Sequence, residues 1–472
     1  MRSWLVTRYF LLAIILGVAR PAAAQTPTLR PEQAMARDIF AELIGINTTF
    51  ERGATTPAAE GVARRLRTAG FPAEDVQVIG FTEKNKSLVA RYRGTGKRKP
   101  IILLAHLDVV EALRSDWSLD PFTLTEKDGY FYGRGTSDIK DMAAIWAATL
   151  IQLKQERFVP DRDIILALTA GEEGGSGSNN GVSWLIENHR NLIDAAYTIN
   201  GDSGDPLERN GKKFARAVQA SEKVFHNVQL EARNSGGHSS QPRPDNAIYQ
   251  LASALTRLAN FNFPVSLNEV TRAYLVAMAP TQPAAVAADI RGVLASPMDT
   301  AAVTRFAARS PLYNAILRTT CVATRLEGGH ANNALPQTAR ALVNCRMLPQ
   351  DKVADVEAAI RRVVADSGVA VTPLDTATLS PPSPIVPEVF NPIARITKAM
   401  WGEVPVIPNM ETGATDGLYL RNIGMPVYGV SGVFLEADDM RAHGKDERIG
   451  VKAFYEGVEF SYRLVKALAS GR

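Results

Sequence analysis

The sequence contains very little cysteine and histidine. Two cysteines, Cys321 and Cys345, and six histidines occur among 472 residues. Two cysteines are too few for a disulfide scaffold, and they lack the CxxC spacing of a thiolate zinc site. Any metal ion in this protein must therefore be held by histidine and carboxylate side chains.

The sequence also lacks an N-terminal apolar run long enough for a membrane span. The run from Tyr9 to Ala19 covers about eleven residues, whereas a spanning helix needs about 20. Arg2 and Arg8 precede this run and alanines 22–24 follow it, which is the pattern of a secretory signal peptide. We expect residues 1–24 to be cleaved, leaving a secreted or periplasmic protein without a stable membrane anchor.

The sequence also lacks a large excess of positive over negative side chains. Lysine and arginine number 53 against 49 acidic residues, and residues 1–24 hold three of the arginines and no acid. The mature chain is therefore close to neutral. Because no segment is rich in lysine or arginine, a nucleic-acid partner is not expected. We expect a small-molecule or peptide substrate.

Apolar strands alternate with helices over much of the chain, which is typical of an α/β fold. Continuous apolar runs, such as Ile101 to Leu104, suit strands that are covered on both faces. Strands are predicted at 101–104, 163–169, 195–199 and 426–430, and helices at 31–70, 142–153 and 451–468. The pattern predicts a sheet domain flanked by helices and built from residues 30–212 and 379–472.

The segment between these two parts, 213–378, predicts a second domain. Its elements follow the order βαββαβ of a ferredoxin-like fold. They are expected at 223–232, 246–259, 319–326, 338–347, 353–364 and 369–372. Residues 264–315 exceed what this fold needs and are interpreted as a helical insertion of unknown purpose. A proline cluster, at 381, 382, 384 and 387, marks the return to the sheet domain.

Several acids and histidines follow predicted strands or precede predicted helices. His106 and Asp108 follow the first buried strand, and an acid beside a histidine can fix the histidine as a metal ligand. The alternative is a strand-end histidine with a solvated aspartate. Asp138 ends the loop Gly133 to Ser137 and could bridge two cations, or simply cap the following helix.

Further acids follow the later strands. Glu172 and Glu173 are adjacent acids that repel each other unless a positive charge lies near them. Asp202 stands at the end of another predicted strand, and His443 lies in a loop before the last helix. In α/β proteins, such residues at the carboxyl ends of strands form the site.

Together these motifs resemble the co-catalytic zinc family of aminoacylases, carboxypeptidases and dipeptidases, relatives of glutamate carboxypeptidase and succinyl-diaminopimelate desuccinylase. The resemblance covers residues 35–468 and rests on five motifs in the family's order. They are His-x-Asp at 106–108, Gly-Arg-Gly-x-x-Asp-x-Lys at 133–140, Glu-Glu at 172–173, Gly-Asp at 201–202 and His-Gly at 443–444. Departures are few: Asp141 replaces a common glycine, and Asp202 replaces a frequent glutamate.

The resemblance implies a zinc-exopeptidase-like sheet domain and an inserted lid and dimerisation domain. It also implies two Zn²⁺ ions per subunit, with Co²⁺ or Mn²⁺ as substitutes. Asp138 would bridge them, His106 and Asp202 would complete one site, and Glu173 and His443 the other. Glu172 would be the general base and Asp108 a clamp behind the ligands. A cis peptide is implied after the bridging acid, at Asp138-Ile139.

Four more residues acquire roles from the resemblance. His238, in Gly-Gly-His-Ser-Ser, would reach the other subunit's site in a homodimer and stabilise the oxyanion, although a turn histidine is the alternative. Asn333 and Arg346 would bind the substrate carboxylate, and Thr415 would lie in a substrate loop. The alternative for Arg346 is a surface arginine on a strand. His189, His226 and His330 are left as structural.

The favoured function is cleavage of an amide or peptide bond in small peptides, by a carboxypeptidase or dipeptidase. An N-acyl-amino-acid amidohydrolase would use the same zinc chemistry, and the sequence does not separate the two. A metal-free binding protein of the same fold should lack a ligand or the base, and here all six are present. Cys321 and Cys345 are symmetric about Asn333 on two predicted strands, so we expect a disulfide, with two buried thiols as the alternative.

Overall fold

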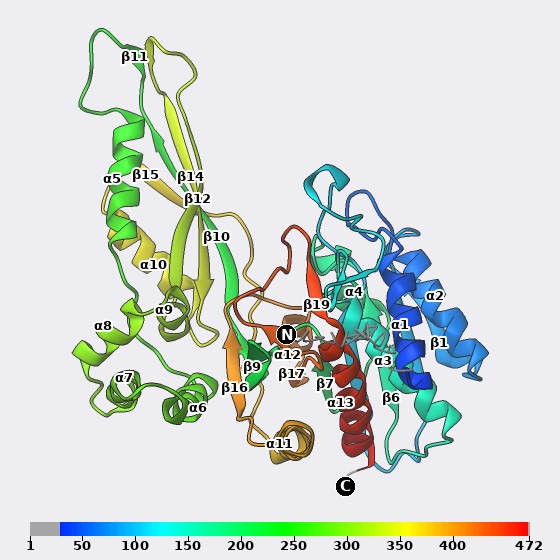
Figure 1. The fold of residues 1–472 in the computed structure, drawn as a ribbon. Coiled ribbons are helices and arrows are strands. Elements are labelled where there is room, and N and C mark those ends of the chain that lie inside the picture. The colour runs from blue at the N-terminus through cyan, green and yellow to red at the C-terminus, as the bar shows by residue number, and fades with distance from the viewer. Residues whose placement is uncertain (1–28, 471–472) are drawn as a thin grey trace, which may run out of the picture.

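The computed structural model describes residues 29–470, so the predicted signal peptide lies outside the described residues. Two bodies stand side by side, one built on a large sheet and the other on a smaller sheet (Figure 1). Within residues 29–470, none of the helices combines the length and the apolar character that crossing a membrane demands.

The large sheet has ten strands and a central parallel part. In spatial order its strands are β1 (Val76–Gly80), β2 (Lys86–Tyr92), β6 (Ile164–Thr169), β3 (Ile101–His106), β7 (Tyr197–Asn200), β17 (Val427–Gly429), β9 (Lys212–Glu222), β8 (Pro206–Arg209) and β18 (Leu435–Glu436), with β16 (Val406–Glu411) paired to β9. Strands β6, β3, β7 and β17 run parallel to their neighbours in this series. Their carboxyl ends therefore meet at one edge of the sheet.

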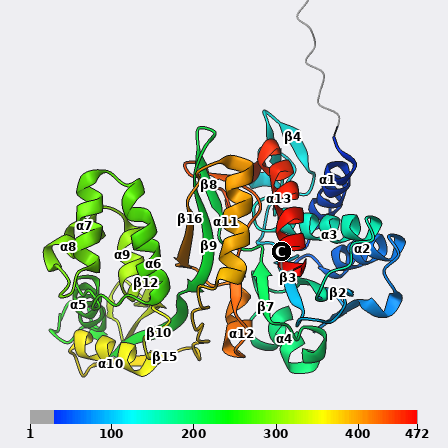
Figure 2. The ribbon, with the colours of Figure 1, turned by 90° about the horizontal axis from the view of Figure 1, so that it is seen from below.

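Helices cover both faces of this sheet, as the continuous apolar strands require. All six residues of β3 are buried. Alternate residues of β3 point to opposite faces, so Leu103 joins one apolar core and Leu104 another. One face is covered by α1 (Pro31–Ile44), α2 (Thr56–Thr68), α3 (Lys140–Gln155), α11 (Pro387–Trp401) and α13 (Val451–Ser470), and the other by α4 (Gly181–Asn188) and α12 (Gly417–Asn422) (Figure 2).

The helix expected over 31–70 is interrupted. The chain leaves α1 at Ile44 and enters α2 at Thr56. The intervening loop packs on the strand that carries His106, because the Thr48 hydroxyl donates to the Leu107 carbonyl at 2.7 Å. A separate three-stranded sheet consists of β4 (Thr125–Lys127), β5 (Tyr130–Tyr132) and β19 (Arg448–Gly450). Short 3-10 turns span 73–75, 114–116, 177–179, 190–192 and 279–281.

The smaller sheet has the expected ferredoxin-like topology. Its strands lie in the order β12 (Thr320–Gly328), β14 (Thr338–Met347), β10 (Val224–Arg233) and β15 (Val369–Pro373), and helices α5 (Ala247–Ala259) and α10 (Val353–Val364) share its core. Cys321 and Cys345 face each other across β12 and β14 and form a disulfide. At the far end, β11 (Gly237–His238) pairs with β13 (Ala334–Leu335) (Figure 1).

The chain passes between the two bodies at Lys223 and again between β15 and α11, and an inserted layer of helices also joins them. The expected boundary at 212/213 falls at the start of β9, a strand of the large sheet that continues to Glu222. Lys223 is the first crossing point and is buried, with Nζ donating to the carbonyls of Ala315 and Arg318 at 2.9 Å. The expected insertion is helical, with α6 (Glu269–Met278), α7 (Ala284–Leu294), α8 (Thr300–Ala308) and α9 (Pro311–Leu317), and its apolar core is continuous with that of the large sheet.

Candidate metal centre

Five predicted ligands converge at the carboxyl edge of the large sheet. His106 is the last residue of β3, and Glu173 and Asp202 follow the ends of β6 and β7. Asp138 precedes α3, and His443 lies in the loop between β18 and β19. The parallel strands therefore bring together residues that are far apart in sequence, as the positions of the motifs predicted. The peptide bond between Asp138 and Ile139 is cis, also as predicted.

The two oxygens of Asp138 face two different histidines. Its Oδ1 lies 3.1 Å from Nε2 of His106, and its Oδ2 lies 2.9 Å from Nε2 of His443. The His106 ring also lies 3.7 Å from Asp202 Oδ1, and the His443 ring lies 3.0 Å from Glu173 Oε1. One carboxylate thus stands between two His-carboxylate pairs, an arrangement that can hold two neighbouring cations.

Glu172 belongs to the same cluster. Ligand atoms of His106, Glu172 and Asp202 lie within 4.8 Å of one another, and those of His106, Asp138 and Glu173 form a second such group. Glu172 therefore lies beside the pair that His106 forms with Asp202. It is within reach of a water molecule or a ligand at that position.

Asp108 makes different contacts from those expected of a clamp on His106. Its Oδ1 lies 3.9 Å from the His106 ring, and Nδ1 of that ring instead lies 2.9 Å from the Asp108 backbone carbonyl. A carbonyl can only accept, so Nδ1 carries the proton and Nε2 is left with a lone pair for a metal. The Asp108 carboxylate accepts from the backbone N–H groups of Gly171, Glu172 and Glu173 at 2.8–3.2 Å. It therefore orients the loop that carries the two glutamates.

The cluster concentrates negative charge where water has been largely removed. Burial raises the pKa of Glu172 well above its usual range, and the Asp202 charge adds to the rise. Burial also raises the pKa of Asp202 to about 7. Contacts with Asp138 and Glu173 raise the pKa of His443 to about 10. Acids this close need a compensating positive charge, and divalent cations suit a donor set of carboxylate oxygens and imidazole nitrogens.

A buried ion pair, which the sequence did not suggest, holds two of the ligand-bearing loops. Arg134 Nη1 donates to Glu447 Oε2 at 2.6 Å, and both side chains are buried, 3% and 0% exposed. Glu447 Oε1 accepts from the backbone N–H groups of Ser137 and Asp138, at 2.8 and 3.2 Å. Arg134 Nη2 also donates to the His443 carbonyl at 3.4 Å. Arg134 lies within a recognised motif, whereas nothing in the sequence around Glu447 singled it out.

A second unexpected network supports Thr415. The Thr415 hydroxyl and backbone N–H both donate to Glu222 Oε2, at 3.0 and 3.1 Å. Glu222 is paired in turn with Arg421 at 2.8 Å, and both side chains are buried. The substrate loop is therefore held by a residue at the end of β9, just before the crossing into the smaller sheet.

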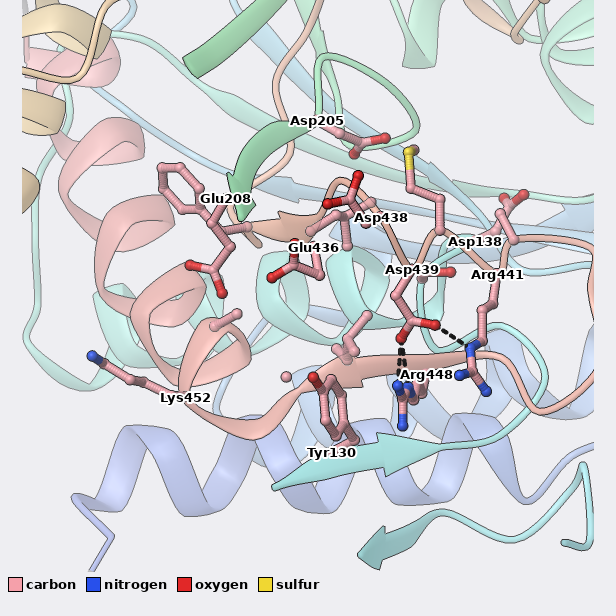
Figure 3. Close-up of a pocket in the computed structure, with 18 of the residues that line it drawn as sticks. Tyr130, Asp138, Asp205, Glu208, Glu436, Asp438, Asp439, Arg441, Arg448 and Lys452 are labelled. Atoms are coloured by element: carbon pink, nitrogen blue, oxygen red, sulfur yellow. Dashed lines mark hydrogen bonds and ion pairs between the residues drawn. The ribbon is translucent and has the colours of Figure 1, made fainter. Parts of the chain in front are cut away.

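Two clefts meet at the centre from different sides. The first, which we call the lid-side cleft, has a volume of about 680 Å³ and is lined by Glu172, Glu173 and His443, together with Arg346 and Thr415. The second, the sheet-side cleft, has a volume of about 590 Å³ and includes Asp138, Asp202 and Asp205 (Figure 3). The ligand cluster thus lies between two spaces that are each large enough for part of a substrate.

Two predicted residues lie away from these clefts. His238 is exposed in β11, and Asn333 is exposed just before β13, at the tip of the smaller sheet (Figure 1). Within one chain, the structure therefore brings Arg346 and Thr415 to the centre but leaves His238 and Asn333 outside it.

Comparisons with known proteins agree with this geometry. The model of peptidase family M20/M25/M40 matches residues 102–467. The N-fatty-acyl-amino acid synthase/hydrolase PM20D1 of Homo sapiens is 29% identical over 375 residues, covering 78% of this chain and 74% of that protein. A probable carboxypeptidase S-like 2 of Dictyostelium discoideum is 28% identical over 394 residues, covering 81% and 74%.

Solved structures show the same fold. The M20 family metallo-carboxypeptidase Sso-CP2 from Sulfolobus solfataricus superposes with a TM-score of 0.68 at 17% identity, covering 92% of this chain and 99% of that one. The family match spans most of the chain and includes all five residues of the ligand cluster. The chain therefore belongs to peptidase family M20/M25/M40 and is a metal-dependent hydrolase of peptide or related amide bonds.

Proposed function

We propose that this protein is an exported di-zinc hydrolase that cleaves an amide bond next to an amino acid with a free carboxylate. The observation that supports this proposal most directly is the position of Asp138, whose two oxygens face His106 and His443 at 3.1 and 2.9 Å. His106 and Asp202 would hold one zinc, and Glu173 and His443 the other. Co²⁺ and Mn²⁺ fit the same donors.

Bound zinc would polarise the amide carbonyl and make a neighbouring water molecule more acidic. Glu172 takes the proton from the attacking water and passes it to the leaving nitrogen. Its pKa is raised by burial, which makes the carboxylate a better proton acceptor. Asp108 keeps the Glu172 loop in place through its three backbone hydrogen bonds.

Arg346 is the proposed anchor for the substrate carboxylate. It lies across from Phe225 on the neighbouring strand, with its guanidinium 4.8 Å from the ring centroid, and both residues line the lid-side cleft. A planar guanidinium that rests on an aromatic ring can still form two parallel hydrogen bonds to a carboxylate. Thr415 and, from the other subunit, Asn333 would contribute further contacts.

A homodimer would complete each site. Strand β12 is an exposed edge of the smaller sheet, and Val322 and Leu326 on it are 61% and 69% exposed. Edge strands of this kind pair readily with a second copy. His238 Nδ1 accepts from the Ser240 backbone N–H at 3.2 Å, so its neutral ring carries the proton on Nε2. We propose that this Nε2–H stabilises the oxyanion in the partner's site.

Two substrate classes fit this chemistry. A carboxypeptidase or dipeptidase would cleave the last peptide bond of a small peptide, and an N-acyl-amino-acid hydrolase would cleave the corresponding acyl amide. Similarity to the human N-fatty-acyl-amino acid synthase/hydrolase supports the second class, and similarity to a probable carboxypeptidase supports the first. In both classes, the amino acid released would occupy the lid-side cleft.

The test combines metal analysis with a substrate panel. Dipeptides and N-acyl amino acids are incubated with zinc-loaded enzyme and with chelator-treated enzyme, and amino acid release is measured. Glu172→Gln should abolish turnover and retain both zinc ions, whereas Glu173→Gln should lose about one ion as well. Loss of zinc from Glu172→Gln, or hydrolysis that survives chelation, would contradict the proposal.

A further inference from the structure

An apolar cavity lies where the inserted helices meet the edge of the large sheet. It has a volume of about 270 Å³ and includes Leu207, Phe214, Met278, Leu312 and Ile407 among its lining residues. The walls come from β8, β9 and β16 on one side and from α6 and α9 on the other. The insertion therefore builds half of a space that a plain ferredoxin-like domain would not have.

This cavity is open and carries apolar side chains that are partly in water. Phe214, Leu312 and Met440 line it and are 36%, 50% and 58% exposed. Two of its polar residues are hydrogen-bonded to each other, because the Asn409 side-chain amide donates to Glu411 Oε1 at 2.7 Å. Concave apolar surface at a join between structural layers is typical of a ligand site.

The cavity adjoins the sheet-side cleft, which reaches the metal centre. Asp205 and Met440 line both this cavity and the sheet-side cleft, which also contains Asp138 and Asp202 (Figure 3). The lid-side cleft, with Arg346, lies at Glu173 and His443 on the other side of the ligand cluster. A substrate that places its carboxylate in the lid-side cleft and its amide at the metals must direct its acyl side towards the sheet-side cleft or solvent.

We propose that the apolar cavity binds the aliphatic acyl chain of an N-acyl amino acid whose amide bond lies at the metal centre. This inference rests on the proposed function and assigns a purpose to the inserted helices α6–α9. The chain would pass Asp205 and Met440 and end against Leu312 and Met278. A peptide with polar side chains would gain nothing from this space.

Chain length provides the first test. N-acyl amino acids from acetyl to hexadecanoyl, all with one amino acid, are compared by kcat/KM below their critical micelle concentrations. Each methylene group that enters the cavity should raise kcat/KM by up to about fourfold, until the cavity is filled. Hydrolysis of the acetyl compound with no gain from longer chains would overturn the acyl-chain site and leave the proposed function intact.

A charged substitution provides the second test. Leu312 is the second residue of α9, where an acid is favourable for the helix, so Leu312→Asp should fold. It should lower the ratio of dodecanoyl to acetyl kcat/KM at least tenfold, because the bound acyl chain would then lie against a charged group. The matched control is Val276→Asp, on α6 at a position that is 61% exposed and outside the cavity lining, and the ratio should not change. Met278→Trp fills the cavity without adding charge and should also lower the ratio.

Binding separates failure of this inference from failure of the proposed function. Isothermal titration calorimetry of zinc-loaded Glu172→Gln protein with N-dodecanoyl amino acid measures affinity without turnover. Affinity should fall at least tenfold when Leu312→Asp is added, and free dodecanoate should bind more weakly because it lacks the amino acid carboxylate beyond the amide. Equal, Leu312-dependent binding of dodecanoate would identify a fatty-acid site and overturn the acyl-substrate assignment. Absence of hydrolysis of every N-acyl amino acid would instead refute the proposed function.

Discussion

Replacing Glu447 by glutamine tests how the metal centre is held together. The wild-type carboxylate accepts hydrogen bonds from Arg134, from the Ser137 backbone and hydroxyl, and from the Asp138 backbone N–H. Glutamine has nearly the same shape, but it removes the negative charge and turns an NH₂ group towards some of these donors. The Arg134 guanidinium, 3% exposed, then remains buried without its counter-charge.

The expected loss is large relative to ordinary protein stability. Removing one partner of a buried ion pair costs about 3–5 kcal/mol, and total stabilities are about 5–15 kcal/mol. We therefore expect Glu447→Gln to lower the free energy of unfolding by at least about 3 kcal/mol. The matched control is Asp438→Asn, which breaks the exposed pair with Arg209 (side chains 64% and 55% exposed) and should leave the free energy of unfolding nearly unchanged.

The assay is urea unfolding of zinc-loaded and chelator-treated protein, followed by circular dichroism, with zinc affinity measured by competition against a chromogenic chelator. Zinc affinity should fall about 10–100-fold, because Glu447 and Arg134 position the loops of Asp138 and His443. The double variant Arg134→Met with Glu447→Leu removes both charges and should recover stability but not zinc affinity. If Glu447→Gln lowers the free energy of unfolding by less than about 1 kcal/mol and leaves zinc affinity unchanged, the reasoning is refuted.

Three further predictions follow from the fold and the site. In the proposed homodimer, His238→Ala and Glu172→Ala should each be nearly inactive alone. Mixing equal amounts should restore about one quarter of wild-type activity, because half of such dimers would contain one intact site. No recovery after confirmed subunit exchange would place His238 outside the partner's site. Burial raises the pKa of Asp205 from 3.8 to about 8, so the folded state holds a proton that the unfolded state releases, and stability from this group is lost as pH rises towards 8. The melting temperature of Asp205→Asn minus that of the wild type should therefore increase from pH 4 to pH 8. A difference in melting temperature that does not change with pH would contradict this assignment. Replacing both cysteines by serine should lower the free energy of unfolding of the oxidised protein by about 3 kcal/mol, as expected for a bridge between residues 24 apart, and identical urea midpoints would exclude that contribution.

Most elements were predictable because their signals are local. Apolar runs gave β3 and β6, and the βαββαβ order in 223–372 matches the strands and helices of the smaller sheet. The interruption between α1 and α2 was missed, because the loop is fixed by a contact from Thr48 to Leu107, 59 residues away. The strand β9 was also missed, so the expected boundary at 212/213 did not include its continuation to Glu222.

By itself, the sequence determined which side chains gather as the candidate ligand cluster and the sheet that presents them. His106, Asp138, Glu173, Asp202 and His443 each lie in a short motif, and parallel strands necessarily bring their carboxyl ends to one edge. Tertiary structure alone decided which groups support them: the Asp108 carboxylate contacts the loop at 171–173 rather than the His106 ring, and Glu447 reaches Arg134 across 313 residues. It also decided that the inserted helices form one side of an open apolar cavity that adjoins the sheet-side cleft. Periodicity and motifs encode local conformation, whereas these contacts depend on how distant segments pack, which no local pattern specifies.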